Sequence, residues 1–157
     1  SDLVSAAYYG SLGGVMQAWR QGAELDEVDP KDGWRAIHAA TMTDMEEVAE
    51  WLLKHRADVN SPGPKGMSAL HLAMRDNSAD MVRLLLKWSA DPTVLDDDGL
   101  TPEAIGEAAG NTRALQALAG QEASPPPAEE QPEPPKEPRF AGGANRQQAE
   151  AAPPRRA

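Results

Sequence analysis

The sequence predicts an all-α solenoid of helix-turn-helix units with β-turn or hairpin fingers, followed by an extended proline-rich C-terminal tail. Gly33, Gly66 and Gly99 recur at intervals of 33 residues, and a fixed period of this length is typical of repeats that stack into one continuous core. Apolar residues inside each period follow helical spacing. From residue 121 onward the chain is rich in Pro, Glu, Ala and Gln, a composition that buries too little apolar surface to fold alone.

Residues 29–60 show how one unit is built. Polar, turn-forming residues lead to Gly33 and predict a tight turn. Residues 35–42 predict a short helix whose small residues let a neighbouring helix approach closely. Residues 44–54 predict a second helix with an apolar stripe made of Val48, Leu52 and Leu53. Because one such unit cannot cover its own stripe, we expect neighbouring units to bury it jointly.

Large apolar side chains on the second helices follow the same register. Leu53 and Leu86 occupy matching positions and are expected to be buried. Trp19 stands at this position in the first unit, so we expect it to be buried too. Trp51 precedes the leucine pair and is expected to pack between units, whereas Trp88 lies at a corner and is expected to be exposed.

A short motif opens the first helix of successive units. Residues 35–40 read Arg-Ala-Ile-His-Ala-Ala, residues 68–73 read Ser-Ala-Leu-His-Leu-Ala, and the next copy begins Thr101-Pro102. These segments resemble the Thr-Pro-Leu-His-x-Ala signature of the ankyrin repeat. The resemblance covers residues 3–119 and implies a domain at 1–120 with a separate tail at 121–157. The expected repeats span about 1–28, 29–60, 61–93 and 94–119.

Charge and composition narrow the classes of partner. The chain of 157 residues carries a net charge of −10 and has no cysteine. Excess negative charge disfavours nucleic acid and anionic membranes, which attract cationic proteins, and the sequence has no apolar run long enough to span a membrane. We therefore expect a protein partner, no nucleic acid and no membrane insertion. The expected location is intracellular, with the cytoplasm favoured and an organelle or cytoskeletal assembly left open.

No arrangement of side chains in the sequence predicts catalysis. It has no nucleophile–base pair, phosphate-cradling loop or metal-ligand cluster, so we expect neither enzyme activity nor a cofactor. His38 and His71 stand at matching positions on the first helices. We interpret them as structural residues that bond to an adjacent turn, because a metal site needs more converging ligands.

The resemblance implies a binding surface on the concave face, which the ankyrin family forms from the turn tips and the exposed side of the first helices. Trp34 follows the first turn glycine and is expected to be exposed there, as a hot spot beside other aromatic and methionine side chains. The expected protein-binding residues are Tyr8, Tyr9, Lys31, Asp32, Trp34, Met42, Thr43, Lys65, Met67, Arg75, Asp76, Asp97, Asp98 and Leu100.

Three functions fit the sequence. The favoured one is a non-catalytic interaction module or assembly subunit, within a large multisubunit complex or with a single partner. Its tail would act as a strap anchored by Arg139 and Phe140, the one large apolar residue of the tail. The alternatives are a regulatory inhibitor that masks a functional surface of its target and an accessory domain of a longer enzyme.

Overall fold

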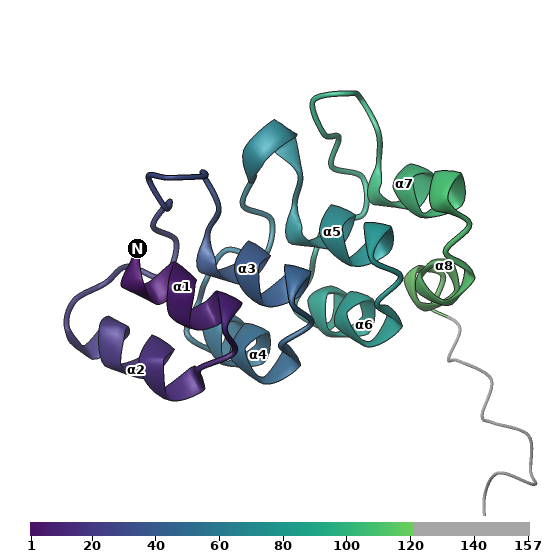
Figure 1. The fold of residues 1–157 in the computed structure, drawn as a ribbon. Helices are drawn as coiled ribbons and strands as arrows, with labels where there is room; N and C mark the ends of the chain where they lie inside the picture. Colours follow the sequence, from purple (N-terminus) through teal and green to yellow (C-terminus); the bar gives the residue numbers. More distant parts are fainter. Residues whose placement is uncertain (121–157) are drawn as a thin grey trace, which may run out of the picture. The chain divides into compact units, whose positions relative to one another are not determined.

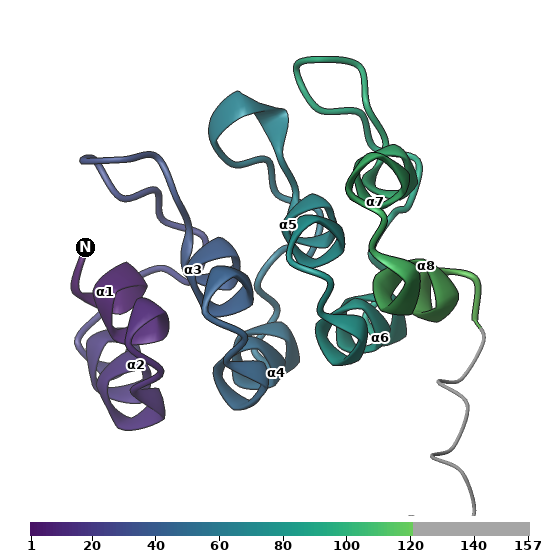
Figure 2. The same ribbon diagram turned by 45° about the vertical axis from the view of Figure 1, so that its right-hand side comes forward.

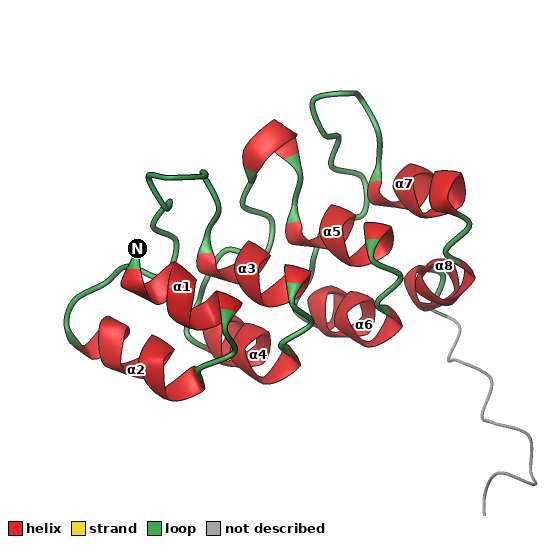
Figure 3. Cartoon of the chain, in the orientation of Figure 1, coloured by secondary structure: helices red, strands yellow, loops and turns green. Residues whose placement is uncertain are grey.

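Residues 1–120 form a helical repeat structure in the computed structural model, which describes this part of the chain (Figure 1; Figure 3). The first helices of the pairs are α1 (Asp2–Tyr8), α3 (Ala36–Met42), α5 (Ala69–Arg75) and α7 (Pro102–Ala109). The second helices are α2 (Leu12–Arg20), α4 (Glu46–Lys54), α6 (Ala79–Lys87) and α8 (Thr112–Leu118). The predicted all-α fold is confirmed, while the predicted tail at 121–157 and its anchor at Arg139 and Phe140 lie outside the described residues.

The helices form two rows, with long loops on one side. In both ribbon views the first helices lie in one row and the second helices in another, and the loops extend from the side of the first helices (Figure 1; Figure 2). We call these loops the first, second and third fingers, at residues 21–35, 55–68 and 88–101. A short 3-10 helix, η1 (Pro64–Gly66), forms the tip of the second finger. Within residues 1–120, no helix combines the length and apolar character needed to cross a bilayer.

Each finger is closed by the same kind of backbone hydrogen bond. Asp29 N donates to Trp34 O at 2.8 Å, Gly63 N to Met67 O at 2.8 Å, and Asp96 N to Leu100 O at 3.0 Å. These bonds draw the two sides of each finger together next to the turn glycine. The side chains that follow the turn therefore lie at the start of the next first helix, where the sequence predicted a binding surface.

The core lies between the two rows and continues from repeat to repeat. First helices contribute Leu3, Ile37 and Leu70, and second helices contribute Val15, Val48, Leu52, Met81 and Leu85, all fully buried. Leu53 is buried as predicted, at 4% exposed. The prediction for Leu86 was wrong, because this side chain is only half-buried at the edge of the core. Leu85, one residue earlier, is the fully buried leucine in that turn of α6.

Histidines connect each central repeat to the finger that follows it. His38 Nε2 lies 3.0 Å from Ser61 O, and His71 Nε2 lies 2.9 Å from Leu100 O. The Nδ1 atom of His38 accepts the N–H of Arg35 at 3.3 Å, so the Nε2 atom carries the proton and donates to Ser61. Burial lowers the pKa of His38 to about 4, because desolvation disfavours the charged imidazolium. The structural interpretation of these histidines is confirmed.

Further polar contacts join successive fingers. Asp26 Oδ1 accepts the N–H of Asp58 at 2.9 Å, and Asn60 Oδ1 accepts the N–H of Asp91 at 2.7 Å, one repeat later. The guanidinium of Arg35 donates to Asp26 O within the first finger, at 3.0 Å, and to Pro62 O in the second finger. Each of these bonds joins neighbouring repeats, the pattern expected when repeats are stabilised by their nearest neighbours.

The tryptophans of the second helices differ from prediction in two cases. Trp19 is 42% exposed rather than buried. Its ring meets Trp51 edge-on at 5.5 Å, and Trp51 stacks on His55 at 3.9 Å, so the three rings cover one another on the outside of α2 and α4. Trp51 thus packs between repeats as predicted. Trp88 is half-buried rather than exposed, because it packs against the core at the end of α6.

Candidate protein-interaction site

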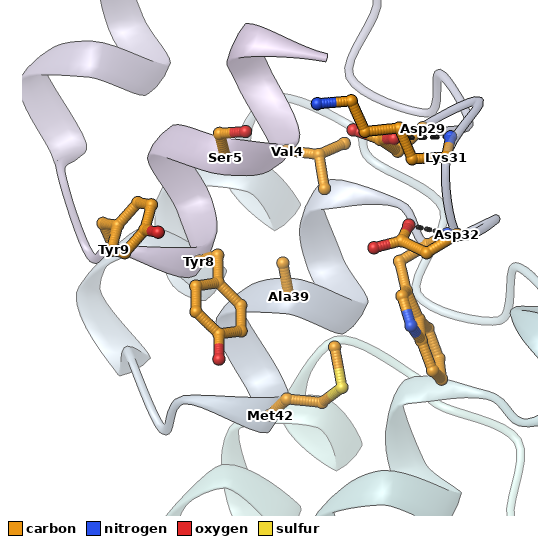
Figure 4. A pocket seen from close by; sticks show the side chains of 10 residues that line it. Val4, Ser5, Tyr8, Tyr9, Asp29, Lys31, Asp32, Ala39 and Met42 are labelled. Carbon is orange, nitrogen blue, oxygen red and sulfur yellow. Dashed lines mark hydrogen bonds between the residues drawn. The ribbon is translucent and has the colours of Figure 1, made fainter.

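A pocket of about 370 Å³ lies between α1, α3 and the first finger (Figure 4). Side chains from two repeats form it, and most of them are aromatic, aliphatic or carboxylate groups. The lining residues are Val4, Ser5, Tyr8, Tyr9, Asp29, Lys31, Asp32, Trp34, Ala39 and Met42. The structure therefore brings together six of the residues that the sequence predicted for protein binding, namely Tyr8, Tyr9, Lys31, Asp32, Trp34 and Met42.

Helical register brings the tyrosines and the methionine to one side. Tyr8 ends α1 and Met42 ends α3, so they occupy the same place in successive repeats. Figure 4 shows Tyr8 and Met42 on neighbouring helices, with Ala39 between them. Ala39 also lines the pocket, and its small side chain occupies little of the space. Tyr8 is 47% exposed and Tyr9 is 78% exposed, and their rings meet edge-on at 5.3 Å.

Trp34 closes the pocket on the side of the first finger. The sequence predicted an exposed indole, but the side chain is half-buried. Its ring lies 5.5 Å from the His38 ring and so close to Gly63 that a Cβ added there would meet Trp34 Cζ3 at 2.9 Å. Glycine in the second finger therefore makes room for the indole of the first. One side of Trp34 packs within the domain, and the remainder lines the pocket.

Charged groups of the first finger form the polar edge of the pocket. Asp32 Oδ1 accepts the N–H of Trp34 at 3.1 Å and thereby holds the turn. Within residues 1–120, no hydrogen bond or ion pair occupies Asp32 Oδ2. Asp29 is buried, and its Oδ1 accepts the N–H of Lys31 at 2.8 Å. Figure 4 shows the Lys31 side chain extending toward Val4 rather than toward Asp32.

The remaining predicted residues do not line this pocket. Met67 was expected beside Trp34 but is half-buried one repeat further along, in the second finger. Thr43 turns its hydroxyl back to Ala39 O at 2.9 Å, and Arg75 pairs with Asp76 at 3.0 Å. The residues of the later fingers are exposed, and they are Lys65, Asp97, Asp98 and Leu100.

Four lining residues were missed from the sequence. Val4 and Ser5 lie one turn before Tyr8 and Tyr9 on α1, and Ala39 stands one turn before Met42 on α3. Helical spacing of three or four residues was the signal that could have found them. Asp29 was missed because it lies within the first finger rather than on a helix, and only the folded loop brings it to the pocket.

A second hollow, of about 200 Å³, lies beside the ends of α3 and α5. Its lining is mostly polar, and Ser78 Oγ donates to Asp44 Oδ1 across it at 2.5 Å. Met42 borders this hollow as well as the first pocket. Within residues 1–120, no group of three or more His, Cys, Asp or Glu side chains is placed to hold a metal ion. The first pocket, lined by Tyr8, Tyr9 and Trp34, is therefore the better candidate for binding, and we call it the aromatic pocket.

Comparison with known proteins identifies the repeats. The family model described as ankyrin repeats (3 copies) matches residues 3–96. The chain belongs to the ankyrin-repeat family. Ankyrin repeats generally act as non-catalytic protein-interaction modules.

The curated relatives are proteins of several kinds. The chain is 30% identical over 112 residues to the putative E3 ubiquitin-protein ligase XBAT35 of Arabidopsis thaliana, covering 70% of this chain and 24% of the ligase. It is 43% identical over 84 residues to the BTB/POZ domain and ankyrin repeat-containing protein NOOT2 of Medicago truncatula, covering 52% and 16%. It is 33% identical over 78 residues to protein phosphatase 1 regulatory subunit 27 of Mus musculus, covering 50% of each. The chain thus spans half or less of these relatives.

Proposed function

We propose that this chain is a non-catalytic interaction module that binds a protein partner through its finger face. We define the finger face as the three fingers together with the exposed side of α1, α3, α5 and α7. The observation that carries the proposal is the pocket, in which Tyr8, Tyr9, Trp34 and Met42 meet at one end of this face. Exposed aromatic and methionine side chains are enriched at the centres of interfaces, and a contiguous apolar patch of this kind marks an interaction site.

Charge favours a protein over a nucleic acid as the partner. Residues 1–120 hold 19 acidic and 10 basic side chains, so phosphate backbones are repelled rather than bound. Exposed carboxylates at Asp97 and Asp98 lie on the third finger, away from the aromatic pocket. In a protein complex, such peripheral charges tune the association rate more than the affinity. A single partner and a larger assembly are both compatible with this proposal.

Tyr8→Ala is expected to weaken binding to the native partner by about 2 kcal/mol, the loss typical of an interface hot spot. The partner would be recovered by affinity purification of the tagged full chain from its source cells and identified by mass spectrometry. Because Tyr8 is 47% exposed in the free protein, its removal should lower the free energy of unfolding less than truncation of a fully buried core residue does. Met42→Ala is expected to weaken binding in the same direction but less. Titration calorimetry measures both effects.

Trp19→Ala is the matched control, because Trp19 is an exposed aromatic residue of the same repeat but lies on the second helix. It is expected to leave affinity unchanged. An equal loss of affinity in Trp19→Ala and Tyr8→Ala would mean that binding does not distinguish the finger face from the side of the second helices. Normal binding by Tyr8→Ala and Met42→Ala, with loss only in Trp19→Ala, would assign binding to the second helices and reject the proposal.

A further inference from the structure

The aromatic pocket combines apolar walls with a carboxylate at its edge, and an apolar guest would not bind that carboxylate. Its walls are Tyr8, Trp34 and Met42, and its edge carries the Asp32 carboxylate. Figure 4 shows that carboxylate directed toward the space between Tyr8, Ala39 and Met42. A leucine or phenylalanine guest would fill the pocket but would leave the exposed carboxylate of Asp32 at its edge without a partner of opposite charge.

Resting on the proposed function, we propose that this pocket receives an arginine side chain of the protein partner. A guanidinium is flat, donates hydrogen bonds in its plane and presents its face to aromatic rings. It can therefore lie against Tyr8 or Trp34 through a cation–π contact while donating to the carboxylate at the edge. Aromatic rings and the Asp32 carboxylate line the same pocket of about 370 Å³.

The hydrogen bonding of the Asp32 carboxylate supports this assignment. Its Oδ1 atom is engaged by the N–H of Trp34 at 3.1 Å, so the carboxylate is held in place by the same turn that positions the indole. Its Oδ2 atom has no partner within the described part of the chain. A fixed acceptor with a free oxygen beside an aromatic wall is pre-organised for a cationic donor, because little side-chain freedom is lost on binding.

Lys31 is the cation that could compete for the same carboxylate. It makes no ion pair within residues 1–120, and its side chain extends toward Val4 in Figure 4. The chain as a whole has a net charge of −10, which attracts a basic partner at long range. The open Oδ2 atom of Asp32 and the overall charge therefore both favour a cationic guest.

The test uses the full chain labelled with ¹⁵N and a blocked tripeptide, acetyl-Gly-Arg-Gly-amide. Nuclear magnetic resonance should show saturable shifts of the Trp34 indole N–H and of the backbone signals of Tyr8, Asp32 and Met42. We expect a millimolar dissociation constant, on the order of 1 mM, because a single side chain supplies the binding energy. The same tripeptide with citrulline, which has the shape of arginine without its charge, should bind at least about fivefold more weakly. Leucine and phenylalanine tripeptides should bind more weakly than the arginine peptide.

Asp32→Asn is the decisive variant, because an asparagine side-chain oxygen can still accept the N–H of Trp34 while the charge is lost. It should abolish the preference for arginine over citrulline. Asp98→Asn is its matched control, since Asp98 precedes the turn glycine of the third finger just as Asp32 precedes that of the first. It should leave the preference unchanged.

Stronger binding of the leucine or phenylalanine peptide, equal binding of citrulline, or no saturable shift at the pocket would overturn the inference. Such a result would leave the proposed function standing if Tyr8→Ala still weakens binding to the native partner. Conversely, normal partner binding by Tyr8→Ala would reject the proposed function even if the arginine peptide enters the pocket. The two failures are therefore distinguishable.

Discussion

Leu85→Ala is expected to lower the free energy of unfolding by about 2–5 kcal/mol, the range for truncating a fully buried leucine. Leu85 is 0% exposed and belongs to the core between the two rows of helices. The substitution removes buried apolar area and leaves a cavity that the surrounding helices fill only in part. Because each repeat is stabilised by its neighbours, the loss should affect the adjoining repeats as well. Denaturant titration followed by circular dichroism measures the change.

Leu86→Ala is the control for that measurement, because Leu86 follows Leu85 in α6 but is only half-buried. It deletes the same atoms from the same helix, so differences in helix propensity cancel. We expect it to cost about half as much or less, in proportion to the smaller area removed from water. A greater loss in Leu86→Ala than in Leu85→Ala would show that the register of α6 is wrong.

Acidification from pH 6.5 to pH 4 is expected to remove up to about 3 kcal/mol of stability through His38 alone. Burial lowers the pKa of His38 in the folded protein to about 4, from an ordinary value of 6.5. Between these values the unfolded chain binds a proton that the folded chain does not. The stabilising contribution is therefore fully present above pH 6.5 and is lost as the pH falls toward 4. Unfolding titrations at intervals across this range measure it.

His38→Gln separates this effect from the titration of carboxylates. A glutamine amide can still donate toward Ser61 O, the acceptor that His38 Nε2 uses at 3.0 Å, but it does not titrate. The variant should therefore lose less stability than the natural protein between pH 6.5 and pH 4. If the stability of both proteins depends on pH in the same way, His38 does not remain neutral in the folded state. Burial would then not lower its pKa as proposed.

Local sequence patterns were sufficient to predict the repeat architecture. The spacing of Gly33, Gly66 and Gly99 marked the finger turns, and each of these glycines has a positive φ, at 82°, 71° and 78°. The positions of His38 and His71 predicted their bonds to the following turns. These features repeat because each depends on contacts within one repeat or with the next.

Burial at the repeated position on the second helices was less predictable. Trp19, Leu53 and Leu86 share that position, yet Trp19 is 42% exposed, Leu53 is 4% exposed and Leu86 is half-buried. The difference arises because burial depends on the neighbouring repeats and on the size of the side chain itself. An indole extends past the leucine site and reaches the Trp51 and His55 rings. Register alone does not specify this outcome.

The candidate site was predictable where it follows helical register and less so where it depends on the fingers. Tyr8 and Met42 were both predicted for the binding surface, and they end equivalent helices. The half-buried state of Trp34 depends on Gly63, which belongs to a different finger. Met67 was predicted for the same binding surface but does not line the pocket. Contacts between fingers join loops that are distant in sequence, and no periodic pattern encodes them.

Oxidative footprinting of the complex tests most directly whether the finger face binds the partner. Hydroxyl radicals modify exposed aromatic and methionine side chains, and mass spectrometry measures the extent at each one. Tyr8, Tyr9 and Met42 report on the finger face, and Trp19, at 42% exposed, reports on the second helices. We predict that partner binding protects Tyr8, Tyr9 and Met42 and leaves the oxidation of Trp19 unchanged. Protection of Trp19 with continued oxidation of Tyr8, Tyr9 and Met42 would show that the partner binds the second helices instead.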